Sequence, residues 1–328
     1  MKRSEFLMRS VLTAGWLGSG GLIPTMVRAQ TSNWPSRPIK VIVPTAPGGP
    51  SDLVARTWTQ AIASEWNATF VVDNRPGASQ VIGTQAVATA APDGYTLLQA
   101  ASSMATMPLV VGNLSFDVNK DFIAVSQTHL TPLVVVIDPK LPIKSIAELI
   151  RYAKENPGKL SFGHTGEGSS QQLATRLLAQ KTGLKKLLEV PYKGSSQAHP
   201  DLIAGRLSVM IDPVSAVATH VKSGAMRALA VTTAHRIEAF PDLPTVAESG
   251  VPGYEVSSWG GVFVPAATPK EIVDRIHQAL RKTLETPENM KKFADWGLTA
   301  KTSTPAEFDR FVKSEVSRWR AVMLAPQT

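Results

Sequence analysis

The chain has 328 residues, of which 43% are hydrophobic and 18% charged, and it contains no cysteine. This composition predicts an ordered protein with a substantial core, built as two domains of ordinary size or one large domain. The lack of cysteine excludes disulfides, thiol catalysis and thiolate metal sites.

The first thirty residues have the pattern of an export signal. A basic start at Lys2 and Arg3 is followed by an apolar, glycine-rich run from Val11 to Ile23 and by small residues before Gln30. The run is too short and too rich in glycine for a membrane span. We therefore expect residues 1–29 to be a cleaved signal peptide and the mature protein to be periplasmic. The alternative is an amphipathic tail, and the export route, Sec or twin-arginine, stays open.

The charge balance points to small anions rather than to nucleic acid. The formal net charge is +8, and residues 1–29 account for +3 of it, so the mature chain carries +5. Such a positive field favours anionic small molecules, although a solvated basic surface would look the same. Lysines and arginines are scattered, without a basic run or an aromatic-basic stripe, which argues against a nucleic-acid partner.

Apolar strands alternate with amphipathic helices along the mature chain, which predicts an α/β fold with parallel sheets covered by helices on both sides. The expected strands are Ile39–Val43, Thr69–Val72, Thr96–Gln99, Ile123–Ser126, Leu133–Ile137, Leu160–Gly163, Leu207–Ile211, Ala228–Val231 and Gly261–Val264. The expected helices are Asp52–Trp66, Ser79–Ala90, Ser145–Glu155, Ser170–Thr182, Gln197–Ala204, Val214–Ser223, Pro269–Glu285 and Pro305–Met323.

Two segments, Thr131–Pro139 and Tyr254–Pro265, are candidates for crossings between lobes. If the chain leaves one lobe at the first and returns at the second, the first lobe consists of residues 30–133 plus 255–328 and the second of residues 134–254. Such a double crossing makes a two-strand hinge with a ligand cleft between the lobes.

Three glycine-containing loops have the pattern of a turn from a strand into a helix. The first loop is Ala46–Ser51, with Asp52 as the expected cap of the next helix; the second loop is Gly163–Ser170, and the third, a weaker case, is Pro191–Ser196. A strand, a glycine loop and a helix start together turn backbone N–H groups outward around an anion. In an open α/β sheet such loops lie at the carboxyl ends of the strands, where ligands bind. Each loop alone is equally consistent with an ordinary turn.

The motifs of catalysis, metal binding and nucleotide binding are missing from the sequence. The chain has no Gly-x-Ser-x-Gly elbow, no His-Glu-x-x-His, no acidic calcium loop and no phosphate-binding Gly-x-x-x-x-Gly-Lys motif. Its six histidines lie far apart, and His164, in the second loop, is the one candidate for a role in a cleft. A hydrogen-bonded loop histidine remains the simpler interpretation. We therefore expect no enzyme activity, no metal and no cofactor.

Four segments resemble one known family closely. They are WPSRPIKVIVPTAPGGPSDLVAR from Trp34, NRPGASQVIGTQAVATAAPDGYTLL from Asn74, VPYKGSSQAHPDLIAGRLSVMID from Val190 and FPDLPTVAESGVPGYEVSSWGGVFVPAATP from Phe240. Together they are similar to the Bug family, the TctC-like periplasmic receptors of tripartite tricarboxylate transporters. The resemblance runs over essentially the whole mature chain and implies a two-lobed type II periplasmic-binding-protein fold that closes on its ligand.

The resemblance also implies which residues bind the ligand. The first and second loops of the family pinch one carboxylate with N–H groups, hydroxyls and waters; the matching positions here are Ala46, Pro47, Gly48, Gly49, Ser51, Thr165, Gly166, Gly168 and Ser169. The distal part of the ligand would be read by Ser102, Ser103, Tyr192, Lys193, Gly194 and Asp212. Gln172 stands where the family commonly has histidine, and His164 and Glu167 stand where it often has small residues, so the identity of the ligand does not transfer.

The function implied is capture of a small organic acid and its delivery to permease subunits of a tripartite transporter by a monomeric receptor. One alternative is a periplasmic sensor that signals to a membrane kinase; another is an enzyme on a binding-protein scaffold, which would need a nucleophile and a base in the cleft. Dicarboxylates, tricarboxylates, acidic amino acids and aromatic acids all remain candidate ligands. Trp259 is expected to pack at the hinge, with stacking on an aromatic acid as the alternative.

Overall fold

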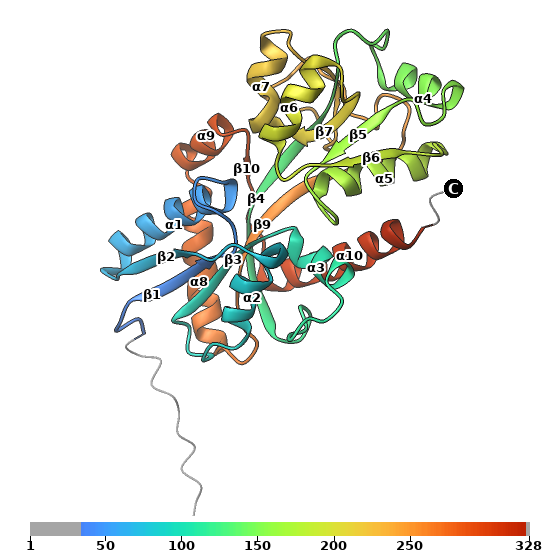
Figure 1. Cartoon of the computed structure of the whole chain (residues 1–328). Coiled ribbons are helices and arrows are strands. Elements are labelled where there is room, and N and C mark those ends of the chain that lie inside the picture. The colour runs from blue at the N-terminus through green and yellow to red at the C-terminus, as the bar shows by residue number, and fades with distance from the viewer. Residues whose placement is uncertain (1–33, 326–328) are drawn as a thin grey trace, which may run out of the picture. The chain divides into compact units, whose positions relative to one another are not determined.

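The computed structural model describes residues 34–325, which form one compact unit (Figure 1). The predicted signal peptide, residues 1–29, lies outside the described residues. Among those that are described, ten strands form one mixed sheet in the order β2-β1-β3-β9-β4-β7-β5-β6, with β10 and β8 paired to β4. The strands are β1 (Ile39–Val43), β2 (Phe70–Asn74), β3 (Thr96–Ala101), β4 (Phe122–Ile137), β5 (Ser161–His164), β6 (Leu188–Pro191), β7 (Val209–Pro213), β8 (Arg227–Val231), β9 (Ser257–Pro265) and β10 (Thr299–Ala300).

Helices cover both faces of this sheet. They are α1 (Pro50–Trp66), α2 (Val81–Ala88), α3 (Ser103–Val110), α4 (Ile146–Glu155), α5 (Ser170–Thr182), α6 (Ser195–Ala204), α7 (Val214–Lys222), α8 (Lys270–Leu284), α9 (Pro287–Asp295) and α10 (Pro305–Leu324). Apolar side chains of α1 and α8 pack on one face of β1, and those of α6 and α7 pack on one face of β4 and β7. Helices α3, α4, α5 and α10 share a third core on the opposite face.

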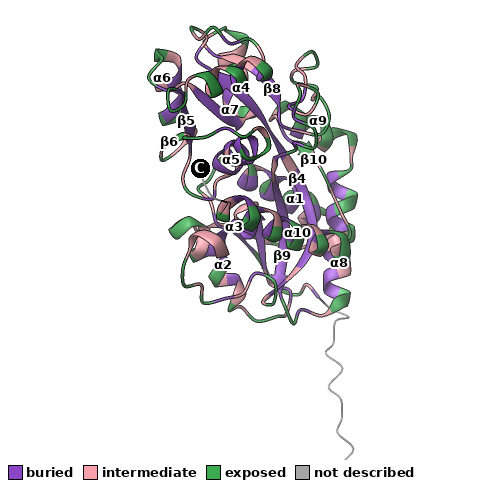
Figure 2. Cartoon of the chain, turned by 90° about the vertical axis from the view of Figure 1, so that its right-hand side faces the viewer, coloured by how far each residue is buried: buried purple, intermediate pink, exposed green. Residues whose placement is uncertain are grey.

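The long strand β4 connects the two parts of the sheet. Residues Phe122–Pro132 pair with β9, and Leu133–Ile137 pair with β7 and β8. Its five apolar residues from Leu133 alternate between two cores, Val134 and Val136 in one and the other three in the second. Burial on both faces explains why the sequence is apolar without a break at this point. Figure 2 shows β4 and β9 as buried strands through the middle of the described unit.

A buried carboxylate ties β9 to the C-terminal helix. Glu315 of α10 is 5% exposed, and its Oε2 accepts the indole N–H of Trp259 on β9 at 3.2 Å and that of Trp319 at 2.8 Å. The Trp259 ring also packs against Phe308 and Phe311 of α10. The predicted packing role of Trp259 is therefore confirmed, and an aromatic ligand does not reach its buried ring.

Several predictions about elements were wrong, among them the start of the helix expected at Ser79–Ala90, because α2 begins only at Val81. The sheet is mixed rather than parallel, because β9 runs antiparallel to β3 and β4, and β4 antiparallel to β7 and β8. The strands expected at Ile123–Ser126 and Leu133–Ile137 are one strand, β4. The cap of α1 is Gly49, not Asp52, because Pro50 already occupies the first helical position and Asp52 lies within the first turn.

Candidate functional site

The first loop joins β1 to α1 and is shaped by two glycines. Gly48 has φ +85° with open space where a side chain would lie, and Gly49 is the extended cap of α1. The Gly48 N–H donates to Asp52 Oδ2 at 2.9 Å, so this amide is satisfied within the loop. Ala46, Pro47 and Gly48 are exposed. The hydrogen-bond donors that the first turn of a helix leaves without intrahelical partners are those near Ser51.

The carboxylate of Asp52 fixes the first loop through hydrogen bonds. Its carboxylate also accepts Arg56 Nε at 3.1 Å and Asn74 Nδ2 at 3.0 Å, and Asn74 Nδ2 lies 3.1 Å from the carbonyl of Thr45. Burial raises the pKa of Asp52, but the hydrogen bonds from Arg56, the Gly48 N–H and Asn74 outweigh it and hold the pKa below its ordinary value. Asp52 is therefore an ionised support of the loop.

The second loop joins β5 to α5. Ser169 caps α5, and its Oγ accepts the N–H of Gln172 at 3.3 Å. The Gly168 N–H donates to Gln172 Oε1 at 2.9 Å. A side chain at Gly168 would lie 2.8 Å from Val110 Cγ1 and 3.4 Å from Thr106, so the second loop lies directly against α3.

A chain of polar side chains continues behind the second loop. Gln172 Nε2 donates to Glu189 Oε2 at 3.0 Å, and Arg176 makes two bonds to the same carboxylate at 2.9 and 2.8 Å. Burial raises the pKa of Glu189, but the bonds from Arg176 and Gln172 lower it further and leave it below its usual value. An ionised Glu189 fixes the amide orientation of Gln172, with Oε1 toward Gly168. His164 is 5% exposed, and its Nδ1 lies 3.0 Å from the Gly166 carbonyl oxygen.

The third loop joins β6 to α6, and β6 is not among the strands expected from the sequence. The hydroxyl of Tyr192 donates to Asp201 Oδ2 at 2.9 Å, and Lys193 is exposed. Burial and the bond to Asp201 raise the pKa of Tyr192, so its phenol stays protonated. Gly194 is the cap of α6, with extended φ of −178°.

Asp212 lies beneath the loops rather than at their surface. Its side chain is fully buried, and its oxygens accept Gln171 Nε2 at 3.2 Å, Ser195 Oγ at 2.7 Å and contact His199 Nε2 at 2.8 Å. It joins α5 and α6 to β7 at the end of the strand. The structure thus shows a positioning role for Asp212, while direct contact with a ligand stays a prediction.

Ser102 and Ser103 lie at the start of α3, which the sequence did not predict. Ser102 Oγ is 2.9 Å from Ser258 Oγ of β9, and the Ser103 hydroxyl donates to Gln80 Oε1 at 2.5 Å. Because β1 and β3 are parallel, these serines share the carboxyl edge of the sheet with the first loop.

The predicted residues therefore form two groups. The first loop, Ser102 and Ser103 lie at the carboxyl ends of β1 and β3; the second and third loops and Asp212 lie at those of β5, β6 and β7. The contact of Gly168 with α3 brings the second loop against the helix that Ser103 begins. Sequence reasoning missed Gln80, Gln171 and Glu189 as supporting residues, since their partners lie far away in the chain.

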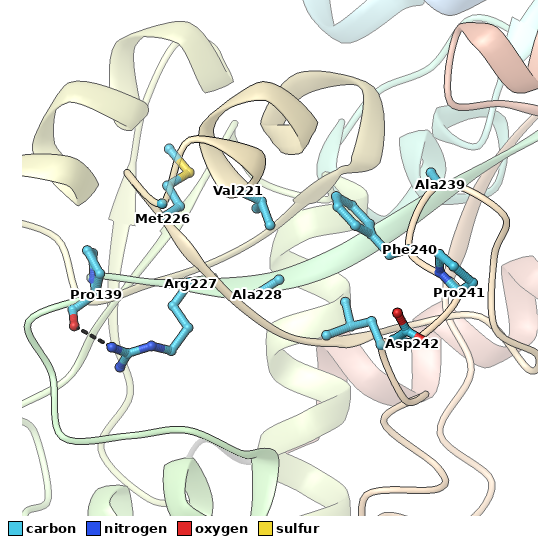
Figure 3. A pocket seen from close by; sticks show the side chains of 11 residues that line it. Pro139, Val221, Met226, Arg227, Ala228, Ala239, Phe240, Pro241 and Asp242 are labelled. Atoms are coloured by element: carbon cyan, nitrogen blue, oxygen red, sulfur yellow. Dashed lines mark hydrogen bonds between the residues drawn. The ribbon is translucent and has the colours of Figure 1, made fainter.

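The cavities among the described residues differ in their relation to these loops. A cavity of about 720 Å³ runs between the start of α1 and α7, and Gly48 is among its lining residues. A cavity of about 590 Å³ is lined by residues that include Met226, Arg227 and Phe240 (Figure 3), and none of its lining residues belongs to the three loops. Arg227 donates to the carbonyls of Pro139, Leu141 and Ile143, so its charge is already satisfied there.

The described residues show an arrangement suited to binding. Ser195 and His199 both contact Asp212, which holds them in position. They form no hydrogen bond with each other, as a serine nucleophile and its histidine base would. No group of His, Asp or Glu within residues 34–325 is arranged to hold a metal ion. Over the same range, the structure contains no helix with the length and apolarity needed to cross a membrane.

A mixed sheet covered by helices, with two long strands at its centre and glycine loops at helix starts, is the fold of the two-lobed periplasmic binding proteins. Solved structures agree: an R. palustris protein with adipate is 35% identical with a TM-score of 0.78, covering 88% of this chain and 97% of that one. MatC from Rhodopseudomonas palustris, with bound malate, is 29% identical with a TM-score of 0.74, covering 88% and 99%. The periplasmic binding protein BugD is 32% identical with a TM-score of 0.73, covering 88% and 97%.

The sequence comparisons identify the family. The family model described as tripartite tricarboxylate transporter family receptor, TctC, matches residues 54–326. Protein BugT of Bordetella pertussis is 37% identical over 295 residues, which cover 88% of this chain and 89% of BugT. The chain belongs to the TctC family of solute-binding receptors, and it is a receptor rather than an enzyme.

Proposed function

We propose that this receptor captures a small carboxylate-bearing metabolite by lobe closure and delivers it to the permease of a tripartite transporter. The observation that carries the proposal is the repeated strand–loop–helix unit at β1–α1 and β5–α5. In both units a helix start and nearby hydroxyl groups face the carboxyl edge of the sheet. Helix N-termini and hydroxyls bind a carboxylate without an arginine.

The bound ligands of two relatives support the same class of solute. The R. palustris relative was solved with adipate and MatC with malate, and both are dicarboxylates. The backbone N–H of Gly48 donates to Asp52 and that of Gly168 donates to Gln172, so neither is available to a ligand. We therefore propose that these glycines shape the loops. The carboxylate is held by Ser51, Thr165, Ser169 and neighbouring N–H groups.

Closure requires two lobes that move about the hinge. We place them at residues 30–133 plus 255–328 and at residues 134–254. The pairing of β4 supports this division, because β4 changes partners from β9 to β7 after Pro132. Ligand contacts with both lobes would stabilise a closed state that is sparsely populated without ligand. We further propose export with loss of residues 1–29 and a monomeric mature receptor.

A thermal-shift screen of residues 30–328, refolded to remove any bound ligand, tests the binding step. The panel contains mono-, di- and tricarboxylates, acidic amino acids and aromatic acids. A ligand at about 100 times its Kd adds roughly 2.7 kcal/mol of stability, which raises the Tm measurably. A response confined to one class identifies the solute; no response to any acid contradicts the carboxylate site.

Closure and delivery need separate measurements. Small-angle scattering of the refolded protein should show a smaller radius of gyration with ligand than without it, and equal radii would contradict closure. Uptake of the labelled ligand should fall in cells that lack the receptor and return when it is restored.

A further inference from the structure

The segment Ala78–Gln80 has an unusual backbone. Ala78, Ser79 and Gln80 have φ of 45°, 53° and 75°, all in the left-handed region, and none is glycine. We call this segment the left-handed turn. Such a conformation is unfavourable for residues with a Cβ atom, and a run of three is kept only where its surroundings enforce it. Strain of this kind is concentrated at ligand-binding and switch segments.

The left-handed turn lies at the same edge of the sheet as the first loop. It follows β2, which pairs in parallel with β1, and β1 pairs in parallel with β3. The helix that begins directly after it, α2, packs closely on the residue that follows β1: a side chain at Gly83 would lie 2.8 Å from Pro44 Cβ. The turn is therefore a further loop at the carboxyl edge of these strands.

Gln80 is fixed in this position by α3. Its Oε1 accepts the hydroxyl of Ser103 at 2.5 Å, and Ser103 begins the helix against which the second loop lies. The bond uses the acceptor end of the amide, which leaves the NH₂ end as a donor. Gln80 is half-buried, and its bond to Ser103 restricts the orientation of the amide.

We propose that the left-handed turn presents the Gln80 amide, beside Ser103, to the second carboxylate of a dicarboxylate solute. The assignment rests on the proposed function and adds a residue that sets specificity. Gln80 supplies a neutral N–H donor and Ser103 fixes its orientation. The strain of the turn is retained because a glycine at position 80, which would relieve it, carries no donor.

Two pairs of probes, adipate with hexanoate and succinate with butanoate, differ by one carboxyl group and test the assignment. Titration calorimetry measures the affinity of each probe for the wild type and for Gln80→Gly. The variant relieves a left-handed φ, so its Tm should equal or exceed that of the wild type. Its affinity for the bound diacid should fall at least tenfold, while its affinity for the matching monoacid stays within twofold.

Lys186 offers a matched control. It also has a left-handed φ, 54°, is exposed, and lies outside the loops of the site. Lys186→Gly should change the Tm in the same direction with no change in the diacid to monoacid ratio. A second variant, Gln80→Glu, keeps the side-chain length but removes the donors, and should lose diacid affinity as Gln80→Gly does.

The outcomes separate this assignment from the proposed function. An unchanged diacid to monoacid ratio in both Gln80 variants overturns the role of Gln80 and leaves the receptor function intact. If the wild-type protein binds monocarboxylates but no dicarboxylate, the role of Gln80 is likewise overturned and the receptor function stands. A wild type that binds no carboxylate overturns both.

Discussion

The Ser169 hydroxyl has one partner inside the protein and one position left for a ligand. Its oxygen accepts the N–H of Gln172, so its own proton is available to a carboxylate in front of α5. We expect Ser169→Ala to weaken ligand binding by about 1–3 kcal/mol. The same change removes a helix cap and lowers the unfolding free energy by about 1 kcal/mol. Calorimetry and urea unfolding measure the two effects.

Ser145 provides the control for Ser169. It caps α4 in the same way, with its Oγ 3.2 Å from the N–H of Glu148. Ser145→Ala should cost the same stability and leave the ligand affinity unchanged. Equal affinities for the two alanine variants would remove Ser169 from the site.

The contact between Gln172 and Glu189 can be tested by exchanging their charges. Gln172→Glu alone places two carboxylates together behind the second loop and should lower the unfolding free energy by about 1–3 kcal/mol. Glu189→Gln in the same chain should restore most of the loss, because a carboxylate at position 172 still accepts the Gly168 N–H and precedes Arg176 by one helical turn on α5. Urea unfolding of the four proteins gives the coupling energy, and additive losses would contradict the contact.

At this scale the sequence predicts the loops better than it predicts the side chains that hold them in position. Glycines, prolines and serines at strand ends identify the first and second loops, because their geometry is set locally. Glu189 is 17 residues from Gln172, and nothing local links them. For the same reason the sequence cannot tell that Asp212 is buried under its partners, or that Gln80 meets Ser103.

His129 makes the strand β4 sensitive to pH. It is 2% exposed, and a side chain at Gly260 of β9 would lie 2.1 Å from its ring. Burial lowers the pKa of His129 to about 4, whereas an unfolded histidine titrates near 6.5. Between these values the unfolded chain binds the proton and the folded chain does not. Stability should therefore fall by about 1.4 kcal/mol per pH unit as the pH drops from about 6.5 toward 4.

Urea unfolding at pH 7 and pH 5 checks this prediction. His129→Gln should remove this part of the pH dependence, whatever its effect on stability at pH 7. The exposed His235 serves as the control, and His235→Gln should retain the full dependence. The same pH dependence in His129→Gln as in the wild type would be inconsistent with a neutral, buried His129.

Whole elements follow from the sequence where one physical signal dominates. Strand β1 and helix α5 have the predicted bounds, because one is a β-branched run and the other a capped amphipathic helix. Helix α3 was missed, since it is apolar on most sides and contains Pro108. The direction of β9 was missed as well, because residue periodicity reports burial and not strand orientation.

At the scale of the molecule, the contact between Gly168 and α3 joins the two groups of loops. Gly168→Ala should lower the free energy of unfolding for two reasons. Alanine is unfavourable at the left-handed φ of 70°, and its Cβ would clash with Val110. Gly183→Ala is the matched control, with φ 68° and no atom within 4 Å of an added Cβ. Val110→Ala should recover part of the loss in the Gly168 variant and none in the Gly183 variant. Urea unfolding of the wild type, the two glycine variants and the two double variants measures the free energy of unfolding. An equal loss of unfolding free energy in the two glycine variants would exclude the contact.

The predicted crossings between lobes lie on β4 and β9, which pair along Phe122–Pro132 and Ser257–Pro265. The sequence suggested the first of these segments by its apolar run between prolines and the second by the Trp-Gly-Gly within it. It did not predict that one core runs from Leu98 and Phe263 to Leu173 and Val209. That shared core makes the described residues one compact unit, and the lobe boundaries remain a prediction.

The bond of Trp259 and Trp319 to one carboxylate gives this receptor an optical signal of its own. An indole emits at a wavelength that depends on the charge beside it, and both rings share the Glu315 oxygen. Because Trp259 belongs to β9 and Glu315 to α10, a change in the packing of α10 on β9 alters the surroundings of both rings. Such a change can be followed by intrinsic fluorescence without a dye, and the difference between the wild type and Trp319→Phe gives the part of the signal that comes from Trp319.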